Sequence, residues 1–256
     1  RLMLRVDELD CARGGRRILE GISFQLNAGE VLAVLGTNGA GKSTLLASLT
    51  GELAPLSGSV ELAGRALGSW SAQERARRMA VLPQSSSLAF PFSVAEVVAM
   101  GRLPHATGRH QDELIIDQAL EATDVVQLRE RSYLSLSGGE RQRVHLARVL
   151  AQVWGAADQG CLLLDEPTAS LDLAHQQLIL QQARNMAARG LAVVVVLHDL
   201  NLAARYADRL LLLHEGRIGA LGAPWDVLSA ERIAEVFGVE VRIEKHPMQD
   251  SPLIII

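Results

Sequence analysis

Residues 36–44 have the residue types and the spacing that are needed to hold a phosphate group. The segment consists of Gly36, Thr37, Asn38, Gly39, Ala40, Gly41, Lys42, Ser43 and Thr44. It follows a short apolar run and precedes a helical spacing, which is the context that the pattern Gly-x-x-x-x-Gly-Lys-Ser requires. The glycines let the backbone curl around a β-phosphate, Lys42 neutralises the β- and γ-phosphates, and the Ser43 hydroxyl can reach Mg²⁺. This context argues against a chance glycine-rich turn and predicts a P-loop that binds a nucleotide.

Two adjacent acids, Asp165 and Glu166, follow the apolar run 162–164. Ligands of α/β sheets bind at the carboxyl ends of strands. An Asp-Glu-Pro segment taken alone would be a turn with solvated acids, but the P-loop makes a catalytic pair the better interpretation. We expect Asp165 to hold Mg²⁺, directly or through water, and Glu166 to polarise an attacking water as a general base.

Two further polar residues stand at the ends of apolar runs. His198 follows residues 193–197, and from that position it could reach a γ-phosphate and report its presence. Gln84 follows residues 79–83 and offers an uncharged oxygen to Mg²⁺ or to the attacking water. The alternatives are a helix cap or surface position for His198 and an ordinary polar loop position for Gln84.

A second phosphate-binding helix start lies at residues 136–143, Leu-Ser-Gly-Gly-Glu-Arg-Gln-Arg. Ser137 can cap the helix, while Gly138 and Gly139 expose N–H groups at the positive end of the helix dipole. One nucleotide needs only one such cradle. The spare cradle indicates that each nucleotide is held between two copies of the protein.

The order of the elements predicts an α/β fold with a helical insertion. Strands are expected at residues 31–35, 59–62, 79–82, 161–164, 193–197 and 209–213, with strand-like alternation also at the first residues. Helices are expected at residues 42–49, 95–100, 112–122, 138–152, 173–188 and 200–206, and capping boxes at Ser71 and Ser93. Because no strand interrupts the helical patterns after residue 85, we predict a core of residues 1–85 and 158–256 and a helical subdomain of residues 86–157 in one unit. The apolar residues 253–256 are either a final strand or a disordered tail.

Composition excludes several classes of protein. The 256 residues are 48% hydrophobic and carry a formal net charge of −4, so neither wholesale disorder nor a general field for nucleic acid is expected. The two cysteines, Cys11 and Cys161, lack metal-ligand spacing and suggest a reducing cytosol, with Cys161 as a core residue. No signal peptide is visible, and the longest apolar runs are too short to span a bilayer. A membrane would therefore matter through a partner.

Together these motifs resemble the ATP-binding subunit of an ABC transporter over nearly the whole chain. The P-loop, the signature at residues 136–140, the Asp165-Glu166 pair and His198 stand in the family's order, and Gln84 and residues 169–172 match its Q-loop and D-loop. The resemblance implies a P-loop NTPase (RecA-like) core, a small antiparallel β subdomain and an all-helical insertion that carries the signature. It also implies a head-to-tail homodimer with two ATP molecules between the P-loop of one copy and the signature of the other.

A narrower resemblance concerns the helical insertion and its surroundings. Residues 88–94 and 96–102 are similar to importers of iron-siderophore, cobalamin and haem, and residues 146–154 and 198–204 are most similar to the haem importer's ATPase. This implies a peripheral ATPase on the cytoplasmic face of the bacterial inner membrane that energises haem uptake. Its partners would be two copies of a polytopic permease and, indirectly, a periplasmic substrate-binding protein. An iron-siderophore or cobalamin importer, an exporter and a soluble ABC ATPase are the alternatives.

Two stretches leave questions open. Phe90, Pro91 and Phe92 are candidates for a groove that receives a helix of the membrane subunit, or else they fill the core of the insertion. The family usually stacks adenine on an aromatic residue near Arg13, but residues 11–15 contain none. We expect that Arg13 could stack on the base through its guanidinium plane.

Overall fold

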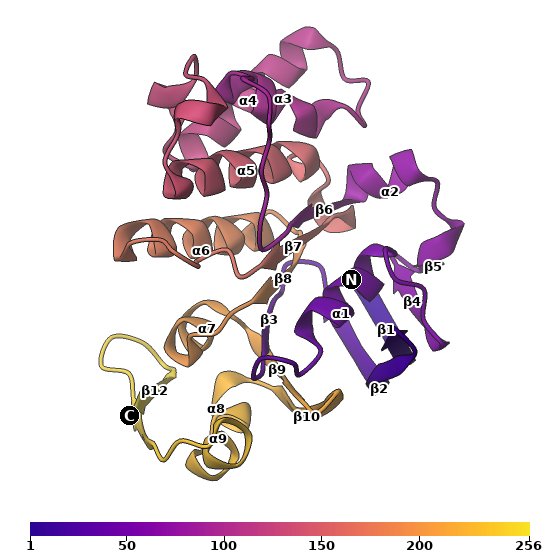
Figure 1. The fold of residues 1–256 in the computed structure, drawn as a ribbon, viewed down its shortest axis with the longest axis vertical. Helices are drawn as coiled ribbons and strands as arrows, with labels where there is room; N and C mark the ends of the chain where they lie inside the picture. Colours follow the sequence, from indigo (N-terminus) through magenta and orange to yellow (C-terminus); the bar gives the residue numbers. More distant parts are fainter.

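Apolar runs form a six-stranded sheet at the centre of the molecule (Figure 1). The computed structural model describes all 256 residues. The strand order is β10 (Arg217–Gly222), β9 (Arg209–His214), β3 (Val31–Leu35), β8 (Ala192–Val196), β7 (Cys161–Asp165) and β6 (Met79–Leu82). Strand β10 is antiparallel to β9, and the other pairs are parallel. The strands that the sequence predicts in this sheet are confirmed. Each parallel strand is an apolar run that is buried on both faces, as is typical of parallel sheets covered by helices.

Side chains of β3 alternate between two hydrophobic cores. Val31, Ala33 and Leu35 face a core that includes residues of α5, α6 and α7, whereas Leu32 and Val34 face a core that includes α1 and the N-terminal strands. The period of two along the strand places helices on both faces of the sheet. The loop after β3 therefore emerges between two packed layers.

A second, antiparallel sheet is built by the N-terminal part of the chain. Its strand order is β2 (Arg16–Asn27), β1 (Leu2–Arg13), β4 (Ser57–Leu62) and β5 (Arg65–Ala66). The strand-like alternation at the N-terminus and the strand at residues 59–62 were predicted from the sequence and are confirmed. Strand β2 was not predicted, because exposed charges such as Arg16 and Arg17 interrupt its apolar alternation.

Nine α-helices connect or cover these sheets. They are α1 (Lys42–Thr50), α2 (Ala72–Arg78), α3 (Val94–Ala99), α4 (Arg109–Ala122), α5 (Gly138–Val153), α6 (Leu173–Ala188), α7 (Leu200–Tyr206), α8 (Pro224–Val227) and α9 (Ala230–Phe237). Short 3-10 turns lie at Leu67–Ser69, Met100–Arg102, Val126–Leu128, Tyr133–Ser135 and Ala157–Gln159. The predicted capping boxes at Ser71 and Ser93 are both formed, and α4 begins three residues before the expected Asp112. No helix is both long enough and apolar enough to cross a membrane.

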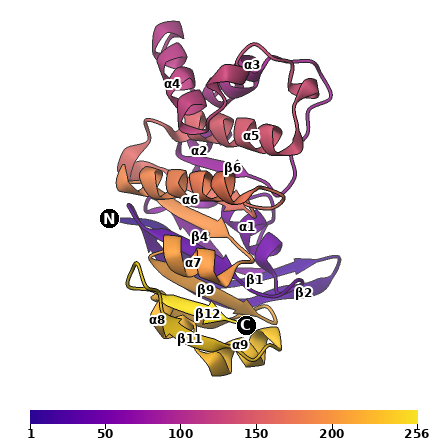
Figure 2. The same ribbon diagram turned by 90° about the vertical axis from the view of Figure 1, so that its left-hand side faces the viewer.

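Helices α3, α4 and α5 enclose a third hydrophobic core. These helices lie at one end of the molecule, and α8 and α9 lie at the other (Figures 1 and 2). Helix α5 contributes to two cores, with Leu146 and Leu150 facing the sheet and Val144 and Ala147 facing α3 and α4. The helix that begins at the predicted signature is thus fixed from both sides.

The chain ends in a hairpin of β11 (Arg242–Lys245) and β12 (Pro252–Ile255). The alternative of a final strand is therefore correct, and the alternative of a disordered tail is wrong. The Asn201 side chain joins the hairpin to α7. Its Nδ2 donates to the Ile254 carbonyl at 3.0 Å, and its Oδ1 accepts from the Ile254 N–H at 2.8 Å.

Candidate active site

Two glycines in the loop between β3 and α1 lie too close to neighbouring residues to carry a side chain without a shift of those neighbours. Gly41 has φ +109°, and a Cβ at this position would lie 2.6 Å from the Leu19 side chain. A Cβ on Gly36 would lie 2.6 Å from the Leu213 carbonyl oxygen. The backbone of the loop therefore packs directly against neighbouring strands, which leaves its other side open to a ligand.

Lys42, the first residue of α1, is only 7% exposed. Its Nζ donates hydrogen bonds to the carbonyls of Gly36 and Thr37 within the loop. Burial lowers the pKa of Lys42, and the charges of Glu166 and Asp165 oppose this shift. The ammonium group thus lies beside both predicted catalytic acids, in a place where an incoming phosphate would compensate for its loss of hydration.

Asp165 and Glu166 stand where β7 ends. Burial raises the pKa of Asp165, the charge of Glu166 raises it further, and Lys42 and His198 oppose the shift. Glu166 has φ +47°, an uncommon conformation for a residue with a side chain. Its N–H donates to the Val196 carbonyl at 3.1 Å, which fixes the acid at the sheet edge.

The Glu166 carboxylate is held on both oxygens. Nε2 of Gln84 donates to Oε2 at 2.8 Å, and Nε2 of His198 lies 2.7 Å from Oε1. These residues follow β6, β7 and β8, which are neighbours in the sheet. Because the carboxyl ends of parallel strands share one edge, three residues far apart in the sequence form a single cluster.

The P-loop and two members of this cluster, Gln84 and Glu166, border a common cleft of about 340 Å³. Its lining comprises Ile18, Asn38, Gly39, Gly41, Lys42, Ser43, Thr44, Gln84 and Glu166. Ile18 was missed by the sequence analysis, because only the pairing of β2 with β1 brings it to the P-loop. Arg13 lies at this edge too, since its Nε donates to the Thr44 hydroxyl at 3.2 Å.

The predicted signature does not line this cleft. Ser137 caps α5 in a capping box with Glu140, as its side chain accepts from the Glu140 N–H at 3.2 Å. Gly138 and Gly139 border a different cleft of about 310 Å³, which shares only Gln84 and Glu166 with the first. The structure therefore keeps the two phosphate cradles of one chain in separate clefts.

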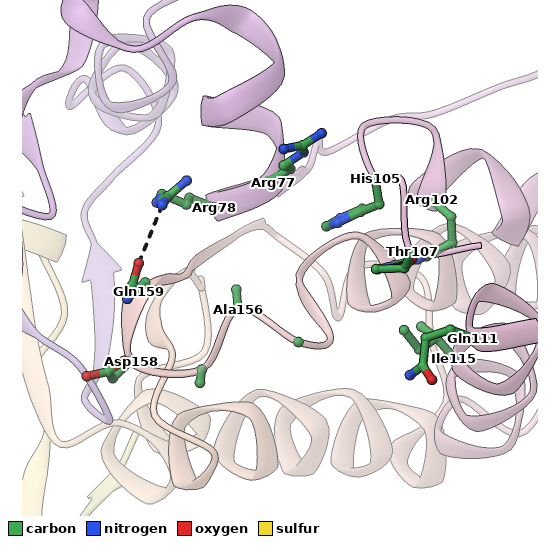
Figure 3. A pocket seen from close by; sticks show the side chains of 12 residues that line it. Arg77, Arg78, Arg102, His105, Thr107, Gln111, Ile115, Ala156, Asp158 and Gln159 are labelled. Carbon is green, nitrogen blue, oxygen red and sulfur yellow. Dashed lines mark hydrogen bonds between the residues drawn. The ribbon is translucent and has the colours of Figure 1, made fainter.

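Another cavity, of about 480 Å³, is lined by none of the predicted site residues (Figure 3). Arg77 and Arg78 of α2 lie on one side of it, with Arg78 bonded to Gln159, and Arg102 and His105 lie on the other. Arg102 is already paired with Asp112 at 2.8 Å. Helix α2 contacts the helical part of the chain beside this cavity, since Nε2 of Gln152 in α5 donates to the Ala76 carbonyl at 2.7 Å.

Residues 19–169 match the family model described as ABC transporter, and this match covers the P-loop, the signature and both acids. The chain belongs to the ABC transporter family. It is an ATPase cassette, which binds ATP and couples its hydrolysis to transport.

Relatives that match nearly the whole of this ABC cassette have a more specific name. A protein of Pseudomonas fluorescens named hemin import ATP-binding protein is 60% identical over 253 residues, which are 99% of each chain. A protein of the same name from Gloeobacter violaceus is 54% identical over 257 residues, covering 99% of this chain and 94% of its own.

Solved structures agree with the cassette's fold. A putative metal-chelate type ABC transporter in an inward-facing conformation aligns with a TM-score of 0.81 at 29% identity, covering 100% of this chain and 98% of its own. The predicted α/β core with an antiparallel β part and helices bearing the signature is confirmed.

Proposed function

We propose that this cassette energises the import of haem across a bacterial inner membrane. The observation that carries the proposal is the 60% identity, over 99% of both chains, to a hemin import ATP-binding protein. Import of an iron-siderophore or of cobalamin is the second candidate, favoured by the similarity to a metal-chelate type transporter. The cassette would touch the transporter rather than the cargo, so the cargo follows from the partner with which it assembles.

In this proposal the P-loop binds the phosphates of ATP. Its nine residues, 36–44, wrap the β- and γ-phosphates, and Lys42 exchanges its bonds to the loop carbonyls for bonds to phosphate oxygens. Arg13 and Ile18, at the edge of the cleft, would contact the adenine ring.

The donor set near the γ-phosphate suits Mg²⁺. Ser43, Gln84 and Asp165 offer a hydroxyl, an amide carbonyl and a carboxylate, which are the hard oxygen ligands that this ion prefers. Mg²⁺ usually keeps several waters and binds substrate phosphates, so both would complete its coordination. The ion would neutralise charge on the phosphates during transfer.

Glu166 acts as the general base in the proposed hydrolysis. It accepts a proton from water as the water oxygen attacks the γ-phosphorus, and the bond to the β–γ bridging oxygen breaks to release ADP. His198 and Gln84 orient the carboxylate and contact the γ-phosphate or the water. The position of Glu166 between the two residues, at 2.7 and 2.8 Å, supports this assignment.

Two copies of the cassette form the complete site. Ser137, Gly138 and Gly139 of one copy bind the nucleotide on the P-loop of the other, which accounts for their separation within one chain. The homodimer assembles with two copies of a polytopic permease on the cytoplasmic face of the membrane, and a periplasmic binding protein delivers the cargo. Residues 86–157 form the helical subdomain that contacts the permease, and 1–85 with 158–256 form the core subdomain.

Reconstitution tests this function. The cassette and its co-purifying permease are placed in proteoliposomes with a periplasmic binding protein, and ATP-driven accumulation of haem, a ferric siderophore and cobalamin is measured separately. Haem should accumulate in an ATP-dependent way and the other two should not. Accumulation of another cargo in place of haem would transfer the assignment to that cargo, and failure to co-purify with any polytopic protein would refute the transport role.

A further inference from the structure

A small cavity beside α5 contains a positive charge without a partner. The cavity has a volume of about 330 Å³ and is lined by Ser85, Ser86, Ser87, Leu88, Met100, His145 and Arg148. The Arg148 side chain makes no ion pair and no hydrogen bond in the chain; its Nε is buried, while the residue as a whole is half-buried. No acidic residue lines the cavity. A buried charge is normally retained only where a partner offsets its loss of hydration.

The neighbouring groups do not offset the charge of Arg148. Burial lowers the pKa of His145 to about 4, so the ring is neutral at pH 7, and its Nε2 lies 2.8 Å from the Tyr133 hydroxyl. Another cation, Arg141, lies over the Tyr133 ring at 5.1 Å. Burial also lowers the pKa of Arg148. The cavity thus has the electrostatic character of one uncompensated guanidinium.

The cavity adjoins the segment that links the catalytic cluster to an exposed aromatic residue. Residues 85–88 follow Gln84 directly, and their three serine hydroxyls form no hydrogen bond within the chain. Two residues further on, Phe90 is 66% exposed and packs edge-on against Phe92. Exposed aromatic residues beside unused donors are typical of a protein interface.

We propose that this cavity receives a carboxylate side chain of the transporter's membrane subunit, which pairs with Arg148. The inference rests on the proposed transport function and adds to it the chemistry of the contact. A carboxylate suits the site because the planar guanidinium can donate two parallel bonds to it, and the serine hydroxyls can satisfy its remaining lone pairs. The charge would be paired in the assembled transporter and unpaired in the free cassette.

Arg148→Met should weaken assembly with the permease without lowering the stability of the isolated cassette. The variant removes an unpaired, half-buried charge at nearly constant length, so the melting temperature of the isolated cassette should stay the same or rise. Assembly with the co-purifying permease should weaken roughly 30-fold, the loss expected when one partner of a buried charge pair is removed. Arg148→Lys, which keeps the charge but not the planar fork, should lose less.

Arg143→Met is the matched control on the same helix. Arg143 donates to the carbonyls of Thr123 and Asp124 inside the cassette, so this variant should melt earlier and assemble normally once folded. A lower melting temperature for Arg148→Met with unchanged assembly would overturn the proposal.

Charge exchange identifies the partner group. Arg148→Glu should abolish assembly, and changing one acidic residue in the cytoplasmic loops of the permease to arginine should restore it. The absence of any restoring change would contradict the proposal. A result with inorganic phosphate could also contradict it. If phosphate stabilises the wild-type cassette, and Arg148→Met abolishes this stabilisation without affecting assembly, the cavity holds a small anion instead of a carboxylate of the permease. If the wild-type cassette binds no permease, the transport role itself fails; if wild type and Arg148→Met bind equally, only the charge pair fails.

Discussion

Glu166 is the residue on which the chemistry of the site depends most directly. Both of its oxygens are held, and an amide in its place could keep both contacts, accepting from Gln84 and donating to His198. Glu166→Gln should therefore leave the fold and ATP binding intact while removing the general base. We expect steady-state ATPase activity to fall about a hundredfold or more. Glu240→Gln, which changes an exposed carboxylate, is the control and should be as active as wild type; normal activity in both variants would remove Glu166 from the mechanism.

Asp165 should show a conflict between stability and function. Its pKa is raised by folding, so the stability it contributes is present below its unfolded pKa and is lost as pH rises through the folded pKa. At pH 7 Asp165→Asn should therefore melt about 2 °C later than wild type without nucleotide, yet bind Mg²⁺-ATP less tightly. The difference in melting temperature should disappear on acidification, whereas the exposed Asp250→Asn should change neither property. Earlier melting of Asp165→Asn at pH 7 would contradict this account.

The positions of several site residues could be predicted from the sequence because simple geometry fixes them. Gln84, Glu166 and His198 each follow an apolar run, and the ends of parallel strands must meet at one edge. Ile18 could not be predicted in this way, because its place in the cleft depends on a β-hairpin register. The missing partner of Arg148 could not be predicted either, since an arginine in a helical pattern usually reaches solvent.

At the scale of elements, the loop before α3 contains two aromatic residues with different roles. The sequence left open whether Phe90 and Phe92 form a docking groove or fill a core, and the structure supports the core alternative for Phe92 and leaves docking by Phe90 a prediction. Phe90 is 66% exposed, whereas Phe92 packs against the third core and its carbonyl accepts from the Tyr133 N–H. The loop is thus anchored by one ring and presents the other.

Single substitutions should separate these two rings. Phe92→Ser should cost about 2 kcal/mol, roughly half the value for a fully buried ring, and lower the melting temperature by about 5 °C. Phe90→Ser should leave the melting temperature unchanged and weaken assembly with the permease. Differential scanning fluorimetry and co-purification measure the two effects, and equal melting shifts in both variants would contradict the division.

Most elements were predictable because their local patterns agree with their tertiary environment. The buried parallel strands are continuous apolar runs, and serine–glutamate pairs mark the starts of α2 and α3. The C-terminal hairpin is different. Its short strands carry charged residues such as Arg242 and Glu244, and its place is fixed by Asn201, which lies fifty-three residues before Ile254. Such a contact leaves no periodic signal in the sequence.

At the scale of the whole molecule, the two phosphate-binding segments lie in separate clefts. Substitutions in them should therefore separate ATP binding by one chain from ATP-dependent pairing of two chains. Lys42→Ala should weaken ATP binding by dilute monomers, because a direct contact to the phosphates is lost. Ser137→Arg should leave monomer binding nearly unchanged but prevent nucleotide-dependent dimerisation. Equilibrium binding at low protein concentration and light scattering in ATP measure the two properties.

Ser137→Ala is the control for this comparison. It loses the helix cap, at about 1 kcal/mol, and one contact to the nucleotide without adding bulk, so it should melt slightly earlier and dimerise more weakly than wild type but far more than Ser137→Arg. Equal loss of monomer affinity in Lys42→Ala and Ser137→Arg would refute a site shared between two copies.

The contacts around Glu166 also bear on how far the site has to rearrange during turnover. Each carboxylate oxygen has two lone pairs, so contacts at 2.7 and 2.8 Å leave each oxygen able to accept from a water molecule as well. Gln84 and His198 should therefore stay beside the acid while it orients the attacking water. The pace of transport would then be set by the meeting of the two copies rather than by movement of the base.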